Sequence, residues 1–292
     1  MIKYKVGVPF TFMGCENPKL DAADVVVLPI PYEGTVHYKG GTRFGPQLII
    51  NASCQTESFD CELKKEIIEQ VKIFTAPKME SNLSSPKNMI DDVYKAAKQI
   101  IAMDKFLVVL GGEHSISSGV AKAYCEKLKN LTVLQIDAHA DLRDEYESTK
   151  YNHACTMRRI RELGVNVVQV SIRSYSLEEH EYIKKDRIKN IFWAPFKKEQ
   201  INDIISACTE NIYITIDADG FDPSIIPATG SPVPGGLQWY ESLDLLRKVF
   251  KEKNVIGFDF VELSSKGGEQ DTRSEDTAAT LIYRLIGYKF LR

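Results

Sequence analysis

Carboxylate and imidazole side chains occupy every second position in one short stretch of this chain. Asp137, His139 and Asp141 follow directly after the apolar run LTVLQI (131–136). Side chains at alternate positions of an extended segment share one face, so these three groups are expected to point the same way. Asp217 and Asp219 repeat the spacing after NIYITI (211–216). An isolated D-x-D is commonly a turn or a solvated loop, but the two groups together favour a shared site.

The four aspartates of these groups would repel one another in a buried site, because an unpaired buried charge is costly. Two divalent cations would balance four carboxylates, which predicts a dinuclear metal site. With two imidazoles added, the donor set is too hard for a thiolate-type zinc site and too rich in nitrogen for a calcium or magnesium cage. We expect two Mn²⁺ ions, for which Fe²⁺, Co²⁺ or Zn²⁺ could substitute. The predicted metal ligands are His114, Asp137, His139, Asp141, Asp217 and Asp219.

The elements that must position these residues are apolar β-branched runs that alternate with helical patterns. Strands are predicted at 23–30, 105–110, 131–136, 165–172, 211–216 and 254–260, and helices near 88–103, 116–128, 197–208, 240–252 and 274–288. Continuous apolar strands separated by helices indicate a parallel sheet covered on both faces. Polar clusters follow five of the strands at their carboxyl ends, where open α/β sheets bind ligands. The site is therefore expected at that edge of the sheet.

Composition sets the broad class of the protein. The chain has 292 residues, 43% of them hydrophobic, and no linker or repeat divides it, so one domain over 1–292 is expected. A net charge of −3 does not suggest binding to nucleic acid or to an anionic membrane. No apolar run approaches the ~20 residues of a membrane span, and the N-terminus lacks a signal-peptide pattern. Six scattered cysteines without a CxxC pair predict free thiols in a reducing cytoplasm.

Several longer segments resemble a known family. GGEHS (111–115), DAHADLRDEYE with the later NHA, and DADGFDPSIIPATGSPVPGGL (217–237) are similar to the three signature segments of the ureohydrolases, the arginase and agmatinase family, and GGTRFGP (40–46) fits as well. The likeness covers nearly the whole chain. It implies a three-layer α/β/α sandwich with a central, mainly parallel sheet of about eight strands, as in the arginase and deacetylase folds. It also implies a binuclear manganese site and a homo-oligomer, either a trimer or a hexamer.

The resemblance further implies a role for each site residue. His114 and Asp141 would hold one manganese, His139 and Asp219 the other, and Asp137 and Asp217 would bridge both. In the reaction that this implies, a bridging hydroxide attacks the guanidinium carbon and Asp141 accepts its proton. His153 stands where the family keeps a proton-shuttling histidine, a task that suits an imidazole titrating near neutrality. Glu262 stands where the family keeps a carboxylate that grips the substrate guanidinium.

The same resemblance favours agmatine as the substrate, with putrescine and urea as products. Ser174 and Ser176 stand where arginases place aspartates, so the amino-acid head group of arginine loses expected contacts. DLRDEYE also resembles the agmatinase branch. Arg143 could bind a carboxylate and points the other way, and ATGSPV (228–233) is closer to arginases. The predicted substrate contacts are Glu262, His153, Arg143 and Ser174.

The sequence leaves other functions open. An arginase, or a ureohydrolase of aminopropylagmatine or guanidinobutyrate, would use the same metal site. A non-catalytic family member would normally have lost a ligand, His153 or Glu262, and all are present. The polar segment 264–276 is expected at the pocket mouth, where it would influence substrate length. His37 and His180 have no partner that the sequence identifies.

Overall fold

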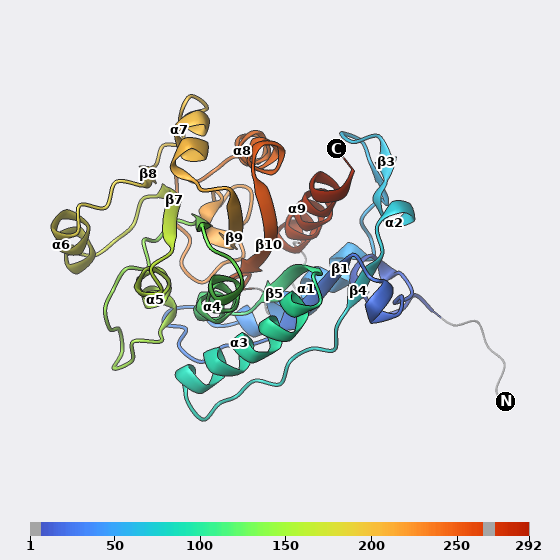
Figure 1. Ribbon diagram of the computed structural model, residues 1–292, viewed down its shortest axis with the longest axis horizontal. Coiled ribbons are helices and arrows are strands. Elements are labelled where there is room, and N and C mark those ends of the chain that lie inside the picture. Colours follow the sequence, from blue (N-terminus) through green and yellow to red (C-terminus); the bar gives the residue numbers. More distant parts are fainter. Residues whose placement is uncertain (1–6, 265–271, 292) are drawn as a thin grey trace.

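An eight-stranded sheet forms the centre of the protein in the computed structural model, which describes residues 7–264 and 272–291 (Figure 1). The order across the sheet is β4-β1-β5-β10-β9-β6-β7-β8, and each neighbouring pair is parallel. The strands are β1 (Val25–Ile30), β4 (Ile73–Thr75), β5 (Phe106–Gly111), β6 (Leu131–Ile136), β7 (Asn166–Ile172), β8 (Ile191–Trp193), β9 (Asn211–Asp217) and β10 (Asn254–Val261).

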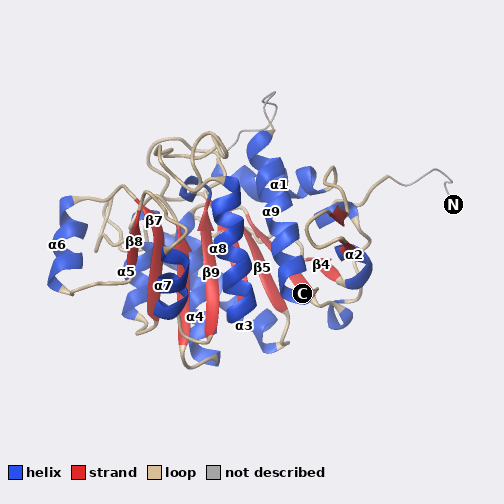
Figure 2. Cartoon of the chain, turned by 90° about the horizontal axis from the view of Figure 1, so that it is seen from above, coloured by secondary structure: helices blue, strands red, loops and turns tan. Residues whose placement is uncertain are grey.

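Helices cover both faces of this sheet, as the view in Figure 2 shows. One apolar cluster joins one face to α1 (Gly45–Ser53), α7 (Gln200–Ala207), α8 (Trp239–Glu252) and α9 (Arg273–Phe290). A second cluster joins the other face to α3 (Pro86–Ala102), α4 (Ser117–Lys127) and α5 (Thr156–Glu162). The short α2 (Ile67–Gln70) follows an antiparallel pair, β2 (Phe59–Asp60) and β3 (Lys65–Glu66), and α6 (Leu177–Lys185) lies beyond the edge strand β8. The predicted three-layer α/β/α sandwich is confirmed.

The long strands are buried from end to end because both faces of the sheet are covered. Every residue of β1, β5 and β6 is buried, which explains why these segments read as continuous apolar runs rather than as alternating ones. All six predicted strands are present, and their ends differ from the predicted ends by at most two residues. The five predicted helices are also present, as α3, α4, α7, α8 and α9.

Several short elements escaped prediction. The strands β4 and β8 have three residues each, which is too short to show a period. The helix α1 begins with Gly-Pro, a pair that marks turns as often as helix starts. The highly charged α6 has little apolar periodicity, and its start is defined by a capping box between Ser176 and Glu179.

Two further expectations concern the whole chain. Among the described residues, none of the helices has the length and apolar character of a membrane span. All six cysteines are free thiols, as predicted. The polar segment predicted at the pocket mouth, 264–276, falls mostly on residues 265–271, which lie outside the described residues.

Candidate active site

Four neighbouring strands at the centre of the sheet bring the predicted metal ligands and Glu262 to one edge. Parallel strands end at the same edge, and β5, β10, β9 and β6 are adjacent in that order. The residues at or just after their carboxyl ends are His114, Glu262, Asp217 with Asp219, and Asp137 with His139 and Asp141. Segments separated by up to about half of the chain are thus brought to one place by sheet order alone.

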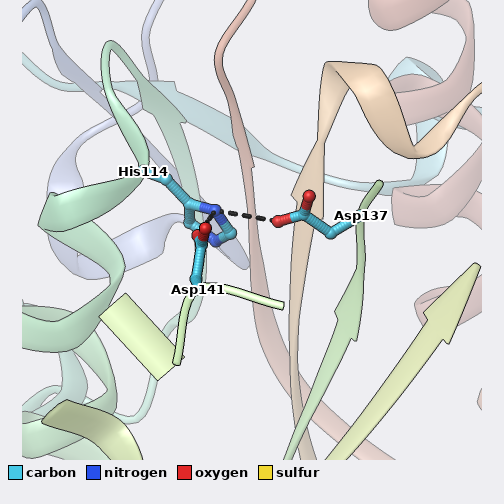
Figure 3. A group of neighbouring side chains, drawn as sticks. All are labelled: His114, Asp137 and Asp141. Atoms are coloured by element: carbon cyan, nitrogen blue, oxygen red, sulfur yellow. Dashed lines mark ion pairs between the residues drawn. The ribbon is translucent and has the colours of Figure 1, made fainter. Parts of the chain in front are cut away.

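His114 faces three carboxylates. Its Nδ1 atom lies 3.0 Å from Asp141 Oδ2, 3.1 Å from Asp137 Oδ2 and 3.4 Å from Asp217 Oδ2. Figure 3 shows the ring of His114 directed at the carboxylates of Asp137 and Asp141. All four side chains are buried, yet Nδ1 is not aligned for a hydrogen bond with any of the three. A ring nitrogen surrounded by oxygen atoms but without a hydrogen bond is an arrangement that could hold a cation.

His139 forms a second group that shares a member with the first. Its Nδ1 atom lies 3.0 Å from Asp219 Oδ2 and 3.7 Å from Asp137 Oδ1. One ligand atom from each of Asp137, His139 and Asp219 could be placed around a single ion, and the same holds for His114, Asp137 and Asp141. The two oxygens of Asp137 therefore face different groups, which is the geometry of a carboxylate that bridges two ions.

The other nitrogen of the His114 ring is held by a buried hydroxyl. Nε2 lies 2.9 Å from Thr215 Oγ1, and that hydroxyl donates to Asp259 Oδ1 at 2.6 Å. Asp259 also accepts a hydrogen bond from Tyr213, and Thr215 and Asp259 are fully buried. Because the hydroxyl proton goes to the carboxylate, Thr215 accepts from Nε2–H, and the Nδ1 lone pair is left for a cation.

Burial and the neighbouring charges shift the pKa values of this group. Burial and the charges of Asp219 and Asp141 raise the pKa of Asp137 to about 7, and burial with Asp219 raises that of Asp217 well above its usual range. Burial opposes protonation of His139, but Asp219 outweighs it and raises the pKa to about 10. Burial and like charge thus disfavour four ionised aspartates side by side, and a cation among them would relieve this repulsion.

Two backbone positions in the site have left-handed torsion angles. Asp141 has φ 52° and Glu262 has φ 61°, a region that non-glycine residues rarely adopt. Such conformations persist where the surrounding structure imposes them, and they concentrate at functional sites. Gly112 of GGEHS is required for a different reason, since a Cβ atom at this position would lie 1.9 Å from Tyr32 O. The loop that carries His114 can therefore pack against the end of β1 only with glycine at 112.

The donor set and its geometry fit a pair of divalent cations. Four aspartates and two histidines converge, one carboxylate faces both groups, and a buried imidazole nitrogen points at three oxygens without a hydrogen bond. Oxygen and imidazole ligands without thiolates suit Mn²⁺ and its neighbours in the first transition row. The described part of the chain thus offers two overlapping metal-binding groups at the predicted edge.

A cavity of about 280 Å³ opens over these groups. His153 and Glu262, to which the family resemblance assigns proton transfer and guanidinium binding, both line it. Glu262 is buried and its Oε1 accepts the backbone N–H of His114 at 2.6 Å. Burial raises the pKa of Glu262 well above its usual range. A cationic ligand beside it would therefore be bound favourably.

Arg143 and Ser174, the other two predicted substrate contacts, also line the cavity. The guanidinium of Arg143 lies 4.7 Å from the ring centre of Tyr146 and 3.9 Å from Glu178 Oε2. Its charge already has two partners, which weakens the expectation that it binds a substrate carboxylate. Ser174 pairs with His139 through a short parallel bridge that continues the sheet past β7.

Some cavity residues were not predicted. Tyr38, Tyr146 and Tyr175 contribute aromatic rings, and Glu179 contributes a carboxylate that caps α6. His37, left without a partner by the sequence, also lines the cavity and pairs with Glu147 at 2.6 Å. Apart from Glu179 in α6, these residues lie in loops after β1, β6 and β7, where no spacing rule reports which side chains turn inward. Only their place beside the recognised motifs could have drawn attention to them.

Comparisons with known proteins agree with this fold. The family model described as "Arginase family" matches residues 23–287. An N(1)-aminopropylagmatine ureohydrolase from Synechocystis sp. is 41% identical over 277 residues, which cover 92% of this chain and 89% of that protein. An agmatinase from Pyrococcus horikoshii is 35% identical over 280 residues, covering 93% of this chain and 95% of that protein.

A solved structure gives the same result. The agmatine ureohydrolase of Thermoplasma volcanium superposes with a TM-score of 0.82 at 28% sequence identity, over 93% of this chain and 92% of that one. The match of the family model spans all eight strands of the sheet and every residue of the predicted site. The chain belongs to the arginase family, as an agmatinase-like ureohydrolase.

Proposed function

We propose that the chain hydrolyses the guanidinium group of agmatine to putrescine and urea, with two manganese ions at the edge of the sheet. The observation that carries this proposal is the shared position of Asp137 between two metal-binding groups, directly beneath the cavity. When bound, the metal pair would supply a water molecule ionised to hydroxide at neutral pH, which is the nucleophile that the reaction needs.

The protein residues would divide the remaining work. His114, Asp137, His139, Asp141, Asp217 and Asp219 are the proposed ligands. Glu262 would bind the guanidinium and hold its carbon over the metal groups, since its buried carboxylate gains a cationic partner from the substrate. Asp141 would take up the proton lost during the attack, and the ring of His153 would give a proton to the leaving amine.

The tail of the substrate would extend toward the cavity mouth. Tyr38, Tyr146 and Tyr175 line the cavity, and aromatic faces attract ammonium groups. Arg143 is engaged by Tyr146 and Glu178, so among the described residues that line the cavity it is not a free cation for an arginine carboxylate. An amine tail without a carboxylate, as in agmatine, fits this lining better than the head group of arginine does.

N(1)-aminopropylagmatine is the second candidate substrate. The relative at 41% identity is named for that compound, and the three tyrosines that line the cavity could stack on a longer amine as well. The secondary and the primary ammonium groups of this compound would then both contact aromatic or carboxylate side chains. The metal site and the role of Glu262 would be the same for either substrate.

A panel of guanidines tests the choice. Urea release would be measured with agmatine, N(1)-aminopropylagmatine, arginine and 4-guanidinobutyrate, each with and without added Mn²⁺. The proposal expects manganese-dependent turnover, with kcat/KM for one of the two amine-tailed substrates well above that for arginine. Equal or better turnover of arginine would overturn the proposed substrate class, and absence of urea from all four would overturn the reaction.

The cellular location and the oligomeric state of the enzyme are also proposals. Six free thiols are most stable in a reducing compartment, which supports a cytoplasmic location. A trimer or hexamer stays a prediction from the family resemblance, and sedimentation of the purified chain would measure it.

A further inference from the structure

The hydroxyl of Thr35 links His153 to a buried carboxylate. Thr35 Oγ1 lies 3.2 Å from Nδ1 of His153 and 2.8 Å from Oε1 of Glu113. Thr35 lies in the loop after β1 and Glu113 follows β5, so the contact joins three separate segments of the chain. Glu113 is fully buried and Thr35 is 7% exposed, which keeps bulk water away from the hydroxyl.

Glu113 is surrounded by donors and acts as an acceptor. Its Oε2 accepts the backbone N–H groups of Gly34 and Thr35, each at 2.6 Å. Its Oε1 accepts from Ser115 Oγ at 2.5 Å as well as from Thr35 Oγ1. An ionised carboxylate has about four acceptor positions, so these four donors satisfy it completely. The one proton of the Thr35 hydroxyl is thereby directed at Glu113.

Thr35 must then accept from His153. A hydroxyl has two lone pairs beyond its proton, and two groups of His153 face them: the backbone N–H at 3.1 Å and ring Nδ1 at 3.2 Å. Because the hydroxyl has no second proton to donate, Nδ1 must carry one. This tautomer is assigned from the hydrogen-bond partners, and it leaves Nε2, on the opposite side of the ring, available to the cavity.

We propose that Thr35 and Glu113 are positioning residues that hold His153 as the Nδ1–H tautomer, with Nε2 as the atom that transfers protons. The proposal rests on the proposed function, in which His153 protonates the leaving amine. A doubly protonated ring gives its Nε2 proton to the amine nitrogen as the carbon–nitrogen bond breaks. The ring that remains is then the neutral Nδ1–H form that Thr35 already favours, so it neither rotates nor exchanges its other proton.

Two substitutions of Thr35 distinguish the positioning role of its hydroxyl from a role in packing. Thr35→Val keeps the shape and removes the hydroxyl, whereas Thr35→Ser keeps the hydroxyl and removes a methyl group. We expect Thr35→Val to lower kcat about 10- to 100-fold with KM little changed, within the range that correctly placed acid–base groups contribute. Thr35→Ser should restore most of kcat. If both variants lose the same activity, or if KM alone changes, the hydroxyl does not act through His153.

A matched control lies next to the same histidine. Thr156 is buried, and its hydroxyl donates to the backbone carbonyl of His153 at 2.8 Å rather than to the ring. Thr156→Val therefore removes a hydroxyl of the same kind without touching either ring nitrogen. Its kcat should exceed that of Thr35→Val at least several-fold; an equal loss would mean that any hydroxyl near His153 is needed only for packing.

The tautomer itself can be observed without any assay. The chain has five histidines, so ¹⁵N labelling of histidine gives few ring signals, and His153→Asn identifies the one of interest. With the zinc-loaded chain as a diamagnetic probe, the neutral His153 ring should show a protonated Nδ1 and an unprotonated Nε2, and Thr35→Val should reduce that preference. A wild-type ring protonated at Nε2 would overturn the proposal.

Failure of the proposed function can be distinguished from failure of the positioning role. If wild-type protein releases no urea from any guanidine, the proposed function fails, while the ring tautomer still decides whether Thr35 and Glu113 set the form of His153. If urea is released but the ring is protonated at Nε2, the function stands and the positioning role is wrong.

Discussion

The Nε2 atom of His114 lies 2.9 Å from the hydroxyl of Thr215, on the side of the ring that faces away from the three carboxylates. A second histidine, His153, has the same kind of partner, since its Nδ1 lies 3.2 Å from the hydroxyl of Thr35. In each case the threonine donates to a fully buried carboxylate, Asp259 or Glu113. In each ring, the threonine thus fixes which nitrogen carries a proton and leaves the other nitrogen available to the site.

Loss of the Thr215 hydroxyl should weaken metal binding. Thr215→Val keeps the volume of the side chain but removes the acceptor for Nε2–H, so the His114 ring is no longer held in the tautomer that leaves Nδ1 free. We expect manganese affinity at the His114 group to fall about 10- to 100-fold, measured by calorimetric titration of the metal-free chain. Thr215→Ser, which keeps the hydroxyl, serves as the control. Unchanged affinity in the valine variant would show that Thr215 has no part in orienting His114.

Neutralising Glu262 should affect substrate binding without destabilising the fold. Glu262→Gln keeps the shape but removes the charge that would pair with the guanidinium, a difference worth about 1.5–3 kcal/mol for a charge-assisted hydrogen bond. KM for the preferred guanidine should rise about 10- to 100-fold. Because burial raises the pKa of Glu262, loss of its charge should not lower the melting temperature.

The control for that variant is Glu241→Gln on α8, where the carboxylate caps its own helix and does not line the cavity. It should leave KM unchanged. A Glu262→Gln variant with normal KM and normal kcat would contradict the assignment of Glu262 to guanidinium binding.

Asp222 should make part of the stability depend on pH. Hydrogen bonds from the side chain and backbone of Ser224 and from the backbone of Gly235 and Gly236 outweigh its partial burial and lower its pKa to about 2. Since the folded-state pKa lies below the unfolded value of about 3.9, its contribution is fully present above pH 4 and is lost as pH falls toward 2.

Asp222→Asn removes this contribution. After allowance for solvent screening of a partly exposed group, the free energy of unfolding should fall by about 1 kcal/mol at pH 7. Denaturant unfolding of the parent and variant should show a clear difference at pH 7 that shrinks by pH 3. An equal difference at both pH values would mean that the charge of Asp222 is not what holds the loop 231–236.

Much of the fold followed from the sequence because the sheet is covered on both sides. Strands such as Leu131–Ile136 and Phe106–Gly111 are buried at every residue, so they appear as unbroken apolar runs that no surface pattern imitates. Edge strands such as Ile191–Trp193 have three residues and only one neighbour, and they leave no such signal.

The candidate site, like the fold, could be predicted from the sequence only in part. The proposed metal ligands could be singled out from the sequence because they follow recognisable strands, and all but His114 also stand at two-residue spacing, as Asp137 and His139 do. The partners that fix the histidine rings could not, because Thr35 and Glu113 are 78 positions apart and Thr215 and His114 are 101 apart. The packing of the folded chain decides which residues meet across such distances. Neither periodicity nor a short motif encodes these contacts.

The number of manganese ions bound per chain tests the central claim most directly. Purified protein would be stripped of metal, loaded with Mn²⁺, freed of excess ion and analysed for metal content alongside Asp137→Ala and Asp141→Ala. The account predicts two ions per chain in the parent, one in Asp141→Ala, which belongs to the His114 group alone, and none held tightly in Asp137→Ala, which belongs to both groups. A parent chain that binds no manganese, or an Asp137→Ala variant that keeps both ions, would contradict the metal site and the chemistry proposed for it.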